Sequence, residues 1–299
     1  MYNCNLKMYK FANLIKKLNS IMNQFKKLNN IAGWVVFLIA SFVYFSTIEQ
    51  TVSFWDCGEY ISTAYKLEVG HPPGAPLFQL FGRIFTLFAA QGTSEVAVAI
   101  NIMSALCSSF TILFLFWTIT AFGRKLFFTN EKEIDLGRII AVLGSGIVGA
   151  LAYTFSDSFW FSAVEGEVYA MSSLFTAATF WCIMKWEQEA DKPHASRWLV
   201  LIGYLIGLSV GVHLLSLLTI PAMGMIYYFK KYEYTKAGAV KAFVSSMIIL
   251  GLVQGVIIPG AVSLISKFEL FFVNTIGLPF NSGTIIYFLA IIGAITFGL

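Results

Sequence analysis

The sequence predicts an all-α integral membrane protein, a multi-pass bundle of helices. Of its 299 residues 58% are hydrophobic and only 12% are charged, whereas a soluble domain carries about 25% charged residues. The charges gather in short clusters between long apolar runs, which is the pattern of bilayer spans. Since every backbone polar group in hydrocarbon needs an internal partner, runs of this length are expected to be helical. The formal net charge of +4 is modest. The basic residues flank apolar runs, which indicates that they set the orientation of the spans in the membrane and that no nucleic acid is bound.

Segment 1–30 is expected to be a basic amphipathic helix on the cytoplasmic surface of the membrane. Its lysines alternate with apolar residues at roughly helical spacing, and the lysines are Lys7, Lys10, Lys16, Lys17, Lys26 and Lys27. The first span is predicted to follow at residues 31–48. Because the lysines precede this span, the positive-inside rule places the N-terminus in the cytoplasm and residue 48 on the outer side.

An outer loop that carries short interfacial helices is predicted over residues 49–95. The apolar run 77–90 within it has Arg83 in its middle and is shorter than the about 20 residues that a span needs. We therefore interpret this run as an interfacial or re-entrant helix with Pro76 in its first turn. On this interpretation the next span, 96–122, leads back to a cytoplasmic basic cluster, as the positive-inside rule requires.

The remaining apolar runs are predicted to alternate across the bilayer. Within 198–229 two short helices are expected to meet near His213, because the run is too long for one ordinary span. The final run stops at Leu299 without a flanking charge cluster, so we expect a truncated chain. Residues 31–299 are thus predicted to form one transmembrane domain, with its later segments at 139–155, an outer turn at 157–167, and then 168–184, 198–229, 242–266 and 284–299.

The first outer segment places two acids beside aromatic side chains. Asp56 and Glu59 follow Trp55, and this combination suits sugar binding because ring faces pack on sugar C–H groups while carboxylates hold hydroxyls and accept protons. Asp56 with Glu59 three residues later is also the pattern of a capping box at the start of a helix. The two roles are compatible.

A second pair of acids, Glu165 and Glu167, opens the span at 168–184. Charged groups at a membrane boundary are usually functional or paired, since their desolvation is unfavourable. The alternative is a structural role at the N-terminus of the helix, where acids are stabilised by the helix dipole. Both glutamates and the Asp56 segment are predicted on the outer face, so a site at the outer membrane interface is expected.

Two histidines and one arginine complete the candidates. His71 precedes Pro72 and is therefore expected in extended backbone, whereas His213 lies in an apolar run and needs a polar partner, so it is either functional or a packing histidine. Arg83 either holds a lipid phosphate or extends to the headgroups. No local ligand spacing supports a metal site. We predict no certain cofactor, although a divalent metal is compatible with His71, His213 and a carboxylate.

The sequence contains no Walker loop, dinucleotide fingerprint or Gly-x-Ser-x-Gly elbow, each of which would mark a different chemistry. Energy for synthesis would have to arrive in the substrate, and a sugar on a polyprenyl phosphate meets that need. One alternative is a transporter or flippase, which the intramembrane glycines and His213 favour. Another is a non-catalytic membrane subunit for the export of surface proteins.

Four motifs occur together in order: FWDCGEYI at 54–61, VGHPPGAPLF at 69–78, AVEGEVY at 163–169 and GLSVGVHLL at 207–215. Together they resemble a bacterial membrane family known as domain of unknown function 2723, which is grouped as glycosyltransferase family 117. The resemblance covers about residues 50–220. The chain is also similar to the protein O-mannosyltransferases, which share the GT-C architecture.

This resemblance implies a GT-C fold in the bacterial inner membrane, with the active face in the periplasm. It implies an inverting transfer of a sugar, for which mannose is a candidate, from a polyprenyl-phosphate donor to a hydroxyl of an exported protein or glycan. GT-C enzymes carry an essential acid in the first outer loop, and Asp56 matches it by position, with Glu59 as its catalytic neighbour. Substrate binding is expected from Trp55, His71, Arg83, Glu165, Glu167 and His213. Family members are much longer than this chain.

Overall fold

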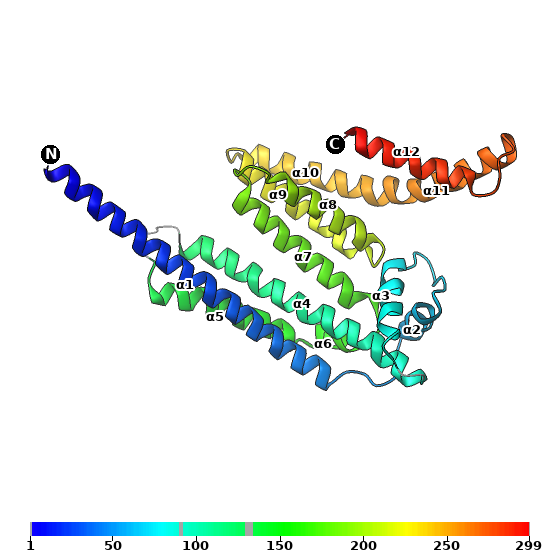
Figure 1. Cartoon of the computed structure of the whole chain (residues 1–299), viewed down its shortest axis with the longest axis horizontal. Helices are drawn as coiled ribbons and strands as arrows, with labels where there is room; N and C mark the ends of the chain where they lie inside the picture. Colours follow the sequence, from blue (N-terminus) through cyan, green and yellow to red (C-terminus); the bar gives the residue numbers. More distant parts are fainter. Residues whose placement is uncertain (1, 90–91, 129–133, 299) are drawn as a thin grey trace. The chain divides into compact units, whose positions relative to one another are not determined.

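The computed structural model describes residues 2–89, 92–128 and 134–298, and these residues form helices and loops with no strand. The chain divides into two compact units, residues 1–219 and 220–299 (Figure 1). Helices long and apolar enough to cross a bilayer are Ser20–Ser46, Ser94–Phe127, Leu136–Thr154 and Lys236–Thr275. The predicted all-α membrane fold is confirmed.

The first unit is built from α1 to α8 and the short helix η2. Its elements are α1 (Tyr2–Ser46), α2 (Cys57–Lys66), α3 (Pro76–Thr86), α4 (Thr93–Phe127), α5 (Leu136–Thr154), α6 (Asp157–Val164), α7 (Val168–Glu189), α8 (Ser196–Val210) and η2 (Leu214–Leu218).

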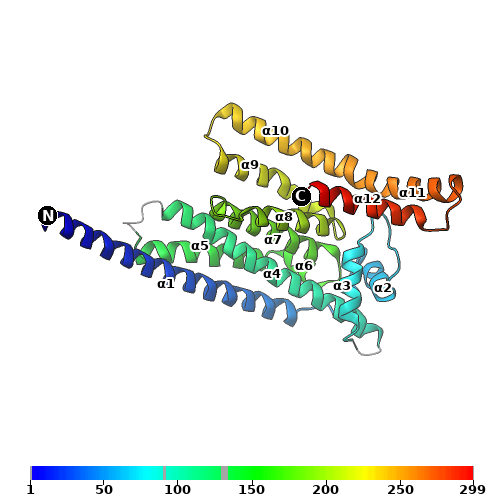
Figure 2. The same cartoon turned by 45° about the horizontal axis from the view of Figure 1, so that its top comes forward.

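Helix α4 lies at the centre of this unit, with α1, α5 and α7 along its sides (Figures 1 and 2). The apolar window of α4 is 67% buried, compared with 22% in α1 and in α5. A cluster of buried apolar side chains joins α1, α4, α5 and α6, and Tyr44 of α1, Phe116 of α4 and Phe159 of α6 belong to it. The hydroxyl of Tyr44 also donates a hydrogen bond to the carbonyl of Thr154, at 3.1 Å.

Two short helices, α2 and α3, lie at the N-terminal end of α4 (Figure 1). Helix α3 has 11 residues and Pro76 in its first turn, so at about 1.5 Å per residue it is about 16 Å long and cannot cross a hydrocarbon core of about 30 Å. This agrees with the short helix predicted at 77–90. A second buried cluster, which includes Ile61, Phe78, Ile100 and Met171, fastens α2 and α3 to α4 and α7.

The structure differs from the sequence prediction at two helix boundaries. Helix α1 runs unbroken from Tyr2 to Ser46, so no helix ends at residue 30, and the reason is that neither Gly nor Pro occurs before Gly33. The side chains of residues 1–19 lie outside those described, and the amphipathic face predicted for them stays a prediction. The turn expected at 157–167 contains helix α6, which buries Phe159 and Ala163 four residues apart on one helical face.

The expected break near His213 is present. Helix α8 ends at Val210 and is followed by Gly211. His213 is extended, with φ −163°, and precedes η2. The backbone N–H of Leu77 donates to the carbonyl of Gly211 at 2.8 Å, so this break meets the start of α3.

The second unit contains α9 (Thr219–Lys231), which begins at the boundary, then α10 (Lys236–Leu252), η3 (Val253–Ile257), α11 (Ile258–Leu270), η4 (Phe271–Thr275) and α12 (Ser282–Gly298). Helix α12 folds back along α11 (Figure 2). The carboxylate of Glu269 fixes this turn, because it accepts hydrogen bonds from the backbone of Asn281, at 2.6 Å, and of Thr284, at 2.9 Å.

Candidate functional site

Asp56 and Glu59 lie at the start of α2, but neither caps the helix. The side chain of Asp56 makes no capping hydrogen bond. The carboxylate of Glu59 contacts His71 instead of turning back to the backbone of Asp56. The capping box that the spacing favoured therefore does not form. The carboxylate of Asp56 makes no cap, and that of Glu59 is held by His71.

His71 joins these two acids. Its backbone N–H and its Nδ1 both contact the carboxylate of Glu59, with Nδ1 at 3.0 Å from Oε2, and its Nε2 lies 4.0 Å from Oδ2 of Asp56. The hydrogen bond with Glu59 and the charge of that residue raise the pKa of His71 above its ordinary value, and the same contacts lower the pKa of Glu59. The three side chains thus form an acid–histidine–acid arrangement, which favours an imidazolium next to Asp56.

Gly70 makes this contact possible. A Cβ at Gly70 would lie 3.0 Å from Oε1 of Glu59 and 3.3 Å from Nε2 of Gln79, which is closer than side chains normally approach. Gln79 donates to the hydroxyl of Thr63, at 3.2 Å, and so belongs to the wall behind Glu59. A side chain at this position would therefore push against the Glu59 carboxylate that holds His71 beside α2.

A second, buried cluster consists of Cys57, Glu165 and Glu167. The two glutamates are only 2% and 8% exposed, and Cys57 is fully buried. Burial raises the pKa of Glu165, and burial together with the charges of Glu165 and Asp56 raises the pKa of Glu167 to about 7. Burial and both glutamates also raise the pKa of the Cys57 thiol. Among the described residues, Oε2 of Glu165 has no hydrogen-bond partner.

Close packing on α4 holds these glutamates in place. Glu165 follows α6, Glu167 precedes α7, and both have extended backbone. A Cβ on Gly166 between them would lie 2.9 Å from Oδ1 of Asn101 and 3.0 Å from Cγ1 of Ile61. Asn101 in turn donates to the carbonyl of Glu49, at 2.7 Å. The loop after α1, helix α2 and the α6–α7 junction are thus assembled around one turn of α4.

The two clusters belong to one site. The charge of Asp56 acts on Glu167. Tyr60, whose ring centre lies 6.0 Å from that of His71, has its pKa raised to about 12 by burial and by the charges of Glu167 and Asp56. The phenol therefore stays protonated and can donate a hydrogen bond between the clusters.

Two groups of side chains in this site have the donor atoms that a divalent cation needs. The ligand atoms of Asp56, Glu59 and His71 lie within 4.8 Å of one another, and so do those of Cys57, Glu165 and Glu167. Carboxylate, imidazole and thiolate are all ligands of zinc, but each must be deprotonated to bind it. The spacing of these residues along the sequence could not reveal either group, because His71 lies 12 residues from Glu59 and the two glutamates come from a different segment than Cys57.

The other predicted residues have different surroundings. Trp55 is 88% exposed and has a positive φ of 62°, which is uncommon for a bulky residue and often marks a functional position. Arg83 contacts the ring of Tyr65, 5.1 Å from the ring centre. Nδ1 of His213 accepts a hydrogen bond from the backbone of Leu215, at 3.1 Å.

The structure therefore brings Asp56, Glu59, His71, Glu165 and Glu167 together. Arg83 and His213 have no described contact with these residues. The sequence reasoning missed Cys57 and Tyr60 as members of the site, although both lie in the FWDCGEYI motif. Their position beside acids in that motif was the signal that could have found them.

Residues 56–236 match the family described as Protein O-mannosyl-transferase TMEM260 N-terminal domain. Similar proteins include the Protein O-mannosyl-transferase tmem260 of Dictyostelium discoideum, which is 31% identical over 48% of this chain and 15% of its own length. The Mus musculus protein TMEM260 of the same description is 26% identical over 58% of this chain and 22% of its own length. The matched segments thus span less than a quarter of these relatives, and no solved structure matches the chain significantly. Because the family match covers more than half of the 299 residues and begins at Asp56, the chain belongs to the family of the Protein O-mannosyl-transferase TMEM260 N-terminal domain.

Proposed function

We propose that this chain is a membrane glycosyltransferase of the GT-C type. It moves a sugar, for which we propose mannose, from a polyprenyl-phosphate donor to a serine or threonine hydroxyl of an exported protein. The observation that carries this proposal is the convergence of Asp56, the Glu59–His71 pair and the buried Glu165 and Glu167 at one end of a bundle of membrane helices. The names of the relatives, which are protein O-mannosyl-transferases, support it.

The site lies on the non-cytoplasmic side in this proposal. Ile100 packs beneath the acids and Arg124 lies near the other end of the same helix α4. The 24 residues between them correspond to about 36 Å of helix, slightly more than the hydrocarbon thickness of about 30 Å. The basic residues Arg124, Lys125 and Lys185 gather at the end away from the acids, so the positive-inside rule assigns that end to the cytoplasm. In a bacterium the acids would face the periplasm.

Asp56 serves as the general base. Its carboxylate accepts the proton of the acceptor hydroxyl, the hydroxyl oxygen forms a bond to the anomeric carbon, and the bond from that carbon to the phosphate oxygen breaks. The imidazolium of His71, which Glu59 holds 4.0 Å from Asp56, stabilises the negative charge that develops on the departing phosphate. A single direct displacement inverts the configuration of the sugar carbon.

The surrounding residues bind the two substrates. The exposed ring of Trp55 offers a face for the sugar, and Glu165 and Glu167 hold sugar hydroxyls, with the proton of Glu167 available as a donor near neutral pH. Arg83 has no acidic partner among the described residues and is available to the donor phosphate. His213 also belongs to the substrate-binding residues of this proposal. It lies beside Tyr169, and the two ring centres are 5.4 Å apart.

A place for the lipid tail adjoins the site. A cavity of about 740 Å³ opens between α3, α4 and residues 50–51. Its walls are mainly apolar and include Phe85, Phe88, Val98 and Ile102. Sites of this size and character accommodate extended apolar ligands, so the prenyl chain can lie here while its phosphate reaches Arg83.

Replacing Asp56 tests the proposal. In vesicles that contain the purified protein, a polyprenyl-phosphate mannose donor and an acceptor peptide, Asp56→Asn is expected to lower the transfer rate by about a hundredfold or more, the range of general-base catalysis. Asp157→Asn, which removes an exposed acid from the first turn of α6, is the matched control and should transfer normally. The product should have the anomeric configuration opposite to that of the donor.

Equal transfer by Asp56→Asn and the wild type, with both proteins correctly inserted, would reject the catalytic role. Movement of the lipid-linked sugar across the vesicle without consumption of the donor would identify a flippase instead. A purified wild-type protein that neither transfers nor moves the donor would favour the non-catalytic subunit.

A further inference from the structure

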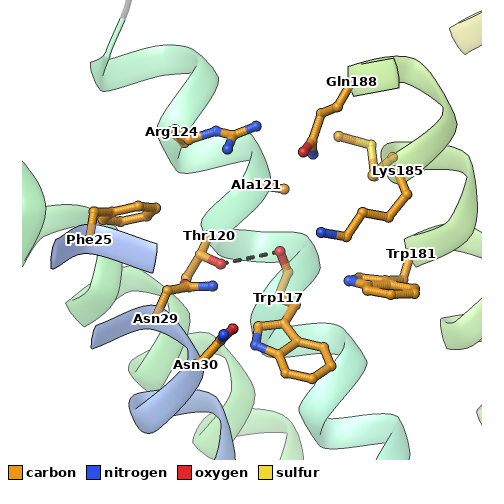
Figure 3. A pocket seen from close by; sticks show the side chains of 11 residues that line it. Phe25, Asn29, Asn30, Trp117, Thr120, Ala121, Arg124, Trp181, Lys185 and Gln188 are labelled. Atoms are coloured by element: carbon orange, nitrogen blue, oxygen red, sulfur yellow. Dashed lines mark hydrogen bonds between the residues drawn. The ribbon is translucent and has the colours of Figure 1, made fainter. Parts of the chain in front are cut away.

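A second polar cavity lies at the end of α4 opposite to the acids. Figure 3 shows it between α1, α4 and α7. Its volume is about 130 Å³, which is sufficient for several water molecules or for one small anion. Its polar walls come from Asn29 and Asn30 of α1, Trp117, Thr120 and Arg124 of α4, and Lys185 and Gln188 of α7.

The lining of this cavity is suited to an anion. Arg124 and Lys185 extend toward the same space, from α4 and α7 respectively (Figure 3), and none of the described residues that line it carries a carboxylate. The indole N–H of Trp117 is buried and has no hydrogen-bond partner among the described residues. An unpaired buried donor is unfavourable in a folded protein, and an acceptor in the cavity would satisfy it.

Two of the described acids near this end, Glu187 and Glu189, are paired with other cations. Glu187 lies 2.7 Å from Nζ of Lys125. Glu189 accepts the indole N–H of Trp198, at 2.8 Å, and pairs with Arg197, at 3.6 Å, and with Lys192. In the part of the chain that the structure describes, Arg124 and Lys185 have no ion-pair partner.

The positive charges in this region also repel one another. Arg124 and Lys26 both act on the ammonium group of Lys185, which lies 5.1 Å from the ring centre of Trp181. A cation–π contact of this kind stabilises the ammonium only modestly. The charge of Glu189 offsets part of this repulsion. Neither cation has an ion-pair partner among the described residues, however, and a bound anion would relieve the repulsion that remains.

We propose that this cavity binds a phosphate group, with the guanidinium of Arg124, the ammonium of Lys185 and the indole N–H of Trp117 as donors. A planar guanidinium and an ammonium are the usual partners of phosphate oxygens, and the amide groups of Asn30 and Gln188 can supply further hydrogen bonds. Both a phospholipid headgroup and a free phosphate have this chemistry. The aromatic walls formed by Trp117 and Trp181 are typical of the membrane interface, where headgroup phosphates lie.

This site is separate from the acidic one. The 24 residues of α4 between Ile100 and Arg124 place the two sites about 36 Å apart along the helix axis. The proposal does not depend on glycosyl transfer, and its tests are measurements of binding.

The test compares binding in two kinds of lipid nanodisc. In one, phosphatidylglycerol is mixed with phosphatidylcholine, and retained anionic lipid is measured by native mass spectrometry. In the other, phosphatidylcholine alone is used and inorganic phosphate is titrated while thermal unfolding is monitored. Retention of one anionic lipid identifies a headgroup, stabilisation by phosphate identifies a free anion, and the absence of both in the wild type overturns the proposal.

Variants locate the binding. The double variant Arg124→Gln/Lys185→Gln is expected to bind at least tenfold more weakly than the wild type. The matched control Lys192→Gln/Arg197→Gln removes the same charge from the same end of the unit, outside the cavity, and should change binding less than twofold. An equal loss in both variants would show a diffuse charge effect and would overturn the proposal.

A third variant keeps both cations and fills the space. Ala121 lines the cavity, so Ala121→Leu should abolish binding while the net charge stays the same. This variant decides the question if the double variant fails to fold, because unchanged binding by Ala121→Leu would exclude the cavity as the site.

Discussion

Replacing Glu167 by glutamine is expected to stabilise the protein at neutral and alkaline pH. Glu167 is 8% exposed, and burial together with the charges of Glu165 and Asp56 raises the pKa of its carboxyl group to about 7. Glutamine has the size of the protonated acid and cannot ionise. The variant therefore removes an unfavourable buried charge while it preserves the packing against α4.

The magnitude and its sign follow from proton linkage. Below pH 4.5 Glu167 is protonated in both the folded and the unfolded state, so the acid contributes nothing unfavourable. As the pH rises from 4.5 through about 7, the unfolded chain ionises before the folded one, and the free energy of unfolding falls. At 1.36 kcal/mol for each pKa unit, the loss is about 3 kcal/mol and is complete above the folded pKa.

The assay is the thermal or denaturant unfolding of the detergent-solubilised protein, measured from pH 4.5 to pH 8 in the presence of EDTA. The wild type should lose stability over this window, and Glu167→Gln should lose about 3 kcal/mol less of its unfolding free energy. Chelation matters because a divalent cation on Cys57, Glu165 and Glu167 would bind the deprotonated groups more tightly as the pH rises and would oppose this loss of stability. A dependence that appears only with EDTA would therefore identify a bound metal.

Glu68→Gln is the control for this measurement. The side chain of Glu68 is 59% exposed and is 4.0 Å from Lys66, and an exposed pair of this kind contributes only about 0–1 kcal/mol. If Glu167→Gln and Glu68→Gln had the same pH dependence as the wild type, Glu167 would titrate as a solvated acid. The assignment of Glu167 to a buried cluster with Cys57 and Glu165 would then be wrong.

Three further predictions concern the acidic site. Glu59→Gln should move the alkaline decline of the transfer rate to lower pH. Glu59 raises the pKa of His71, so without Glu59 the imidazolium is lost at lower pH. A pH profile of kcat/KM measures this, and an alkaline decline at the same pH as in the wild type would contradict the pairing of Glu59 with His71. Gly70→Ala should lower transfer about tenfold, since its methyl group would displace the Glu59 carboxylate only 3.0 Å away. Gly58→Ala, whose added Cβ would meet only Val52 at 3.4 Å, should have less than a twofold effect. Arg83→Gln should raise the KM for the lipid donor about tenfold with little change in kcat if Arg83 holds its phosphate, and an unchanged KM would assign Arg83 to its contact with Tyr65 alone.

The spans could be predicted because each depends on local composition. Long uncharged runs located α4, α5 and α7, and the 11-residue α3 was recognisable from its length and from Pro76. The continuity of α1 was missed because a change from basic to apolar composition resembles an end. A helix stops at a Gly, a Pro or a capping side chain, and neither Gly nor Pro occurs before Gly33. Helix α6 was missed because an eight-residue segment has too few turns for a clear period.

The acidic site could be predicted only in part. The motif residues Asp56, Glu59 and His71 lie within the loop between α1 and α4, and the predicted alternation of the spans grouped them with Glu165 and Glu167. Whether Asp56 caps a helix depends on the loop before α3, which brings His71 against Glu59. No local pattern contains that information, because the partner lies 12 residues farther along the chain.

The burial of Glu165 and Glu167 shows why the protonation of a site cannot be read from sequence. Both acids belong to a polar turn between two helices, which would suggest solvated carboxylates with ordinary pKa values. They are buried because Gly166 packs on Asn101 and Ile61, and these contacts depend on the register of α4 against α2. The same contacts place a protonated Glu167 near an Asp56 whose carboxylate does not cap its helix. In the proposed mechanism Glu167 donates a hydrogen bond to a sugar hydroxyl, and Asp56 accepts the proton of the attacking hydroxyl.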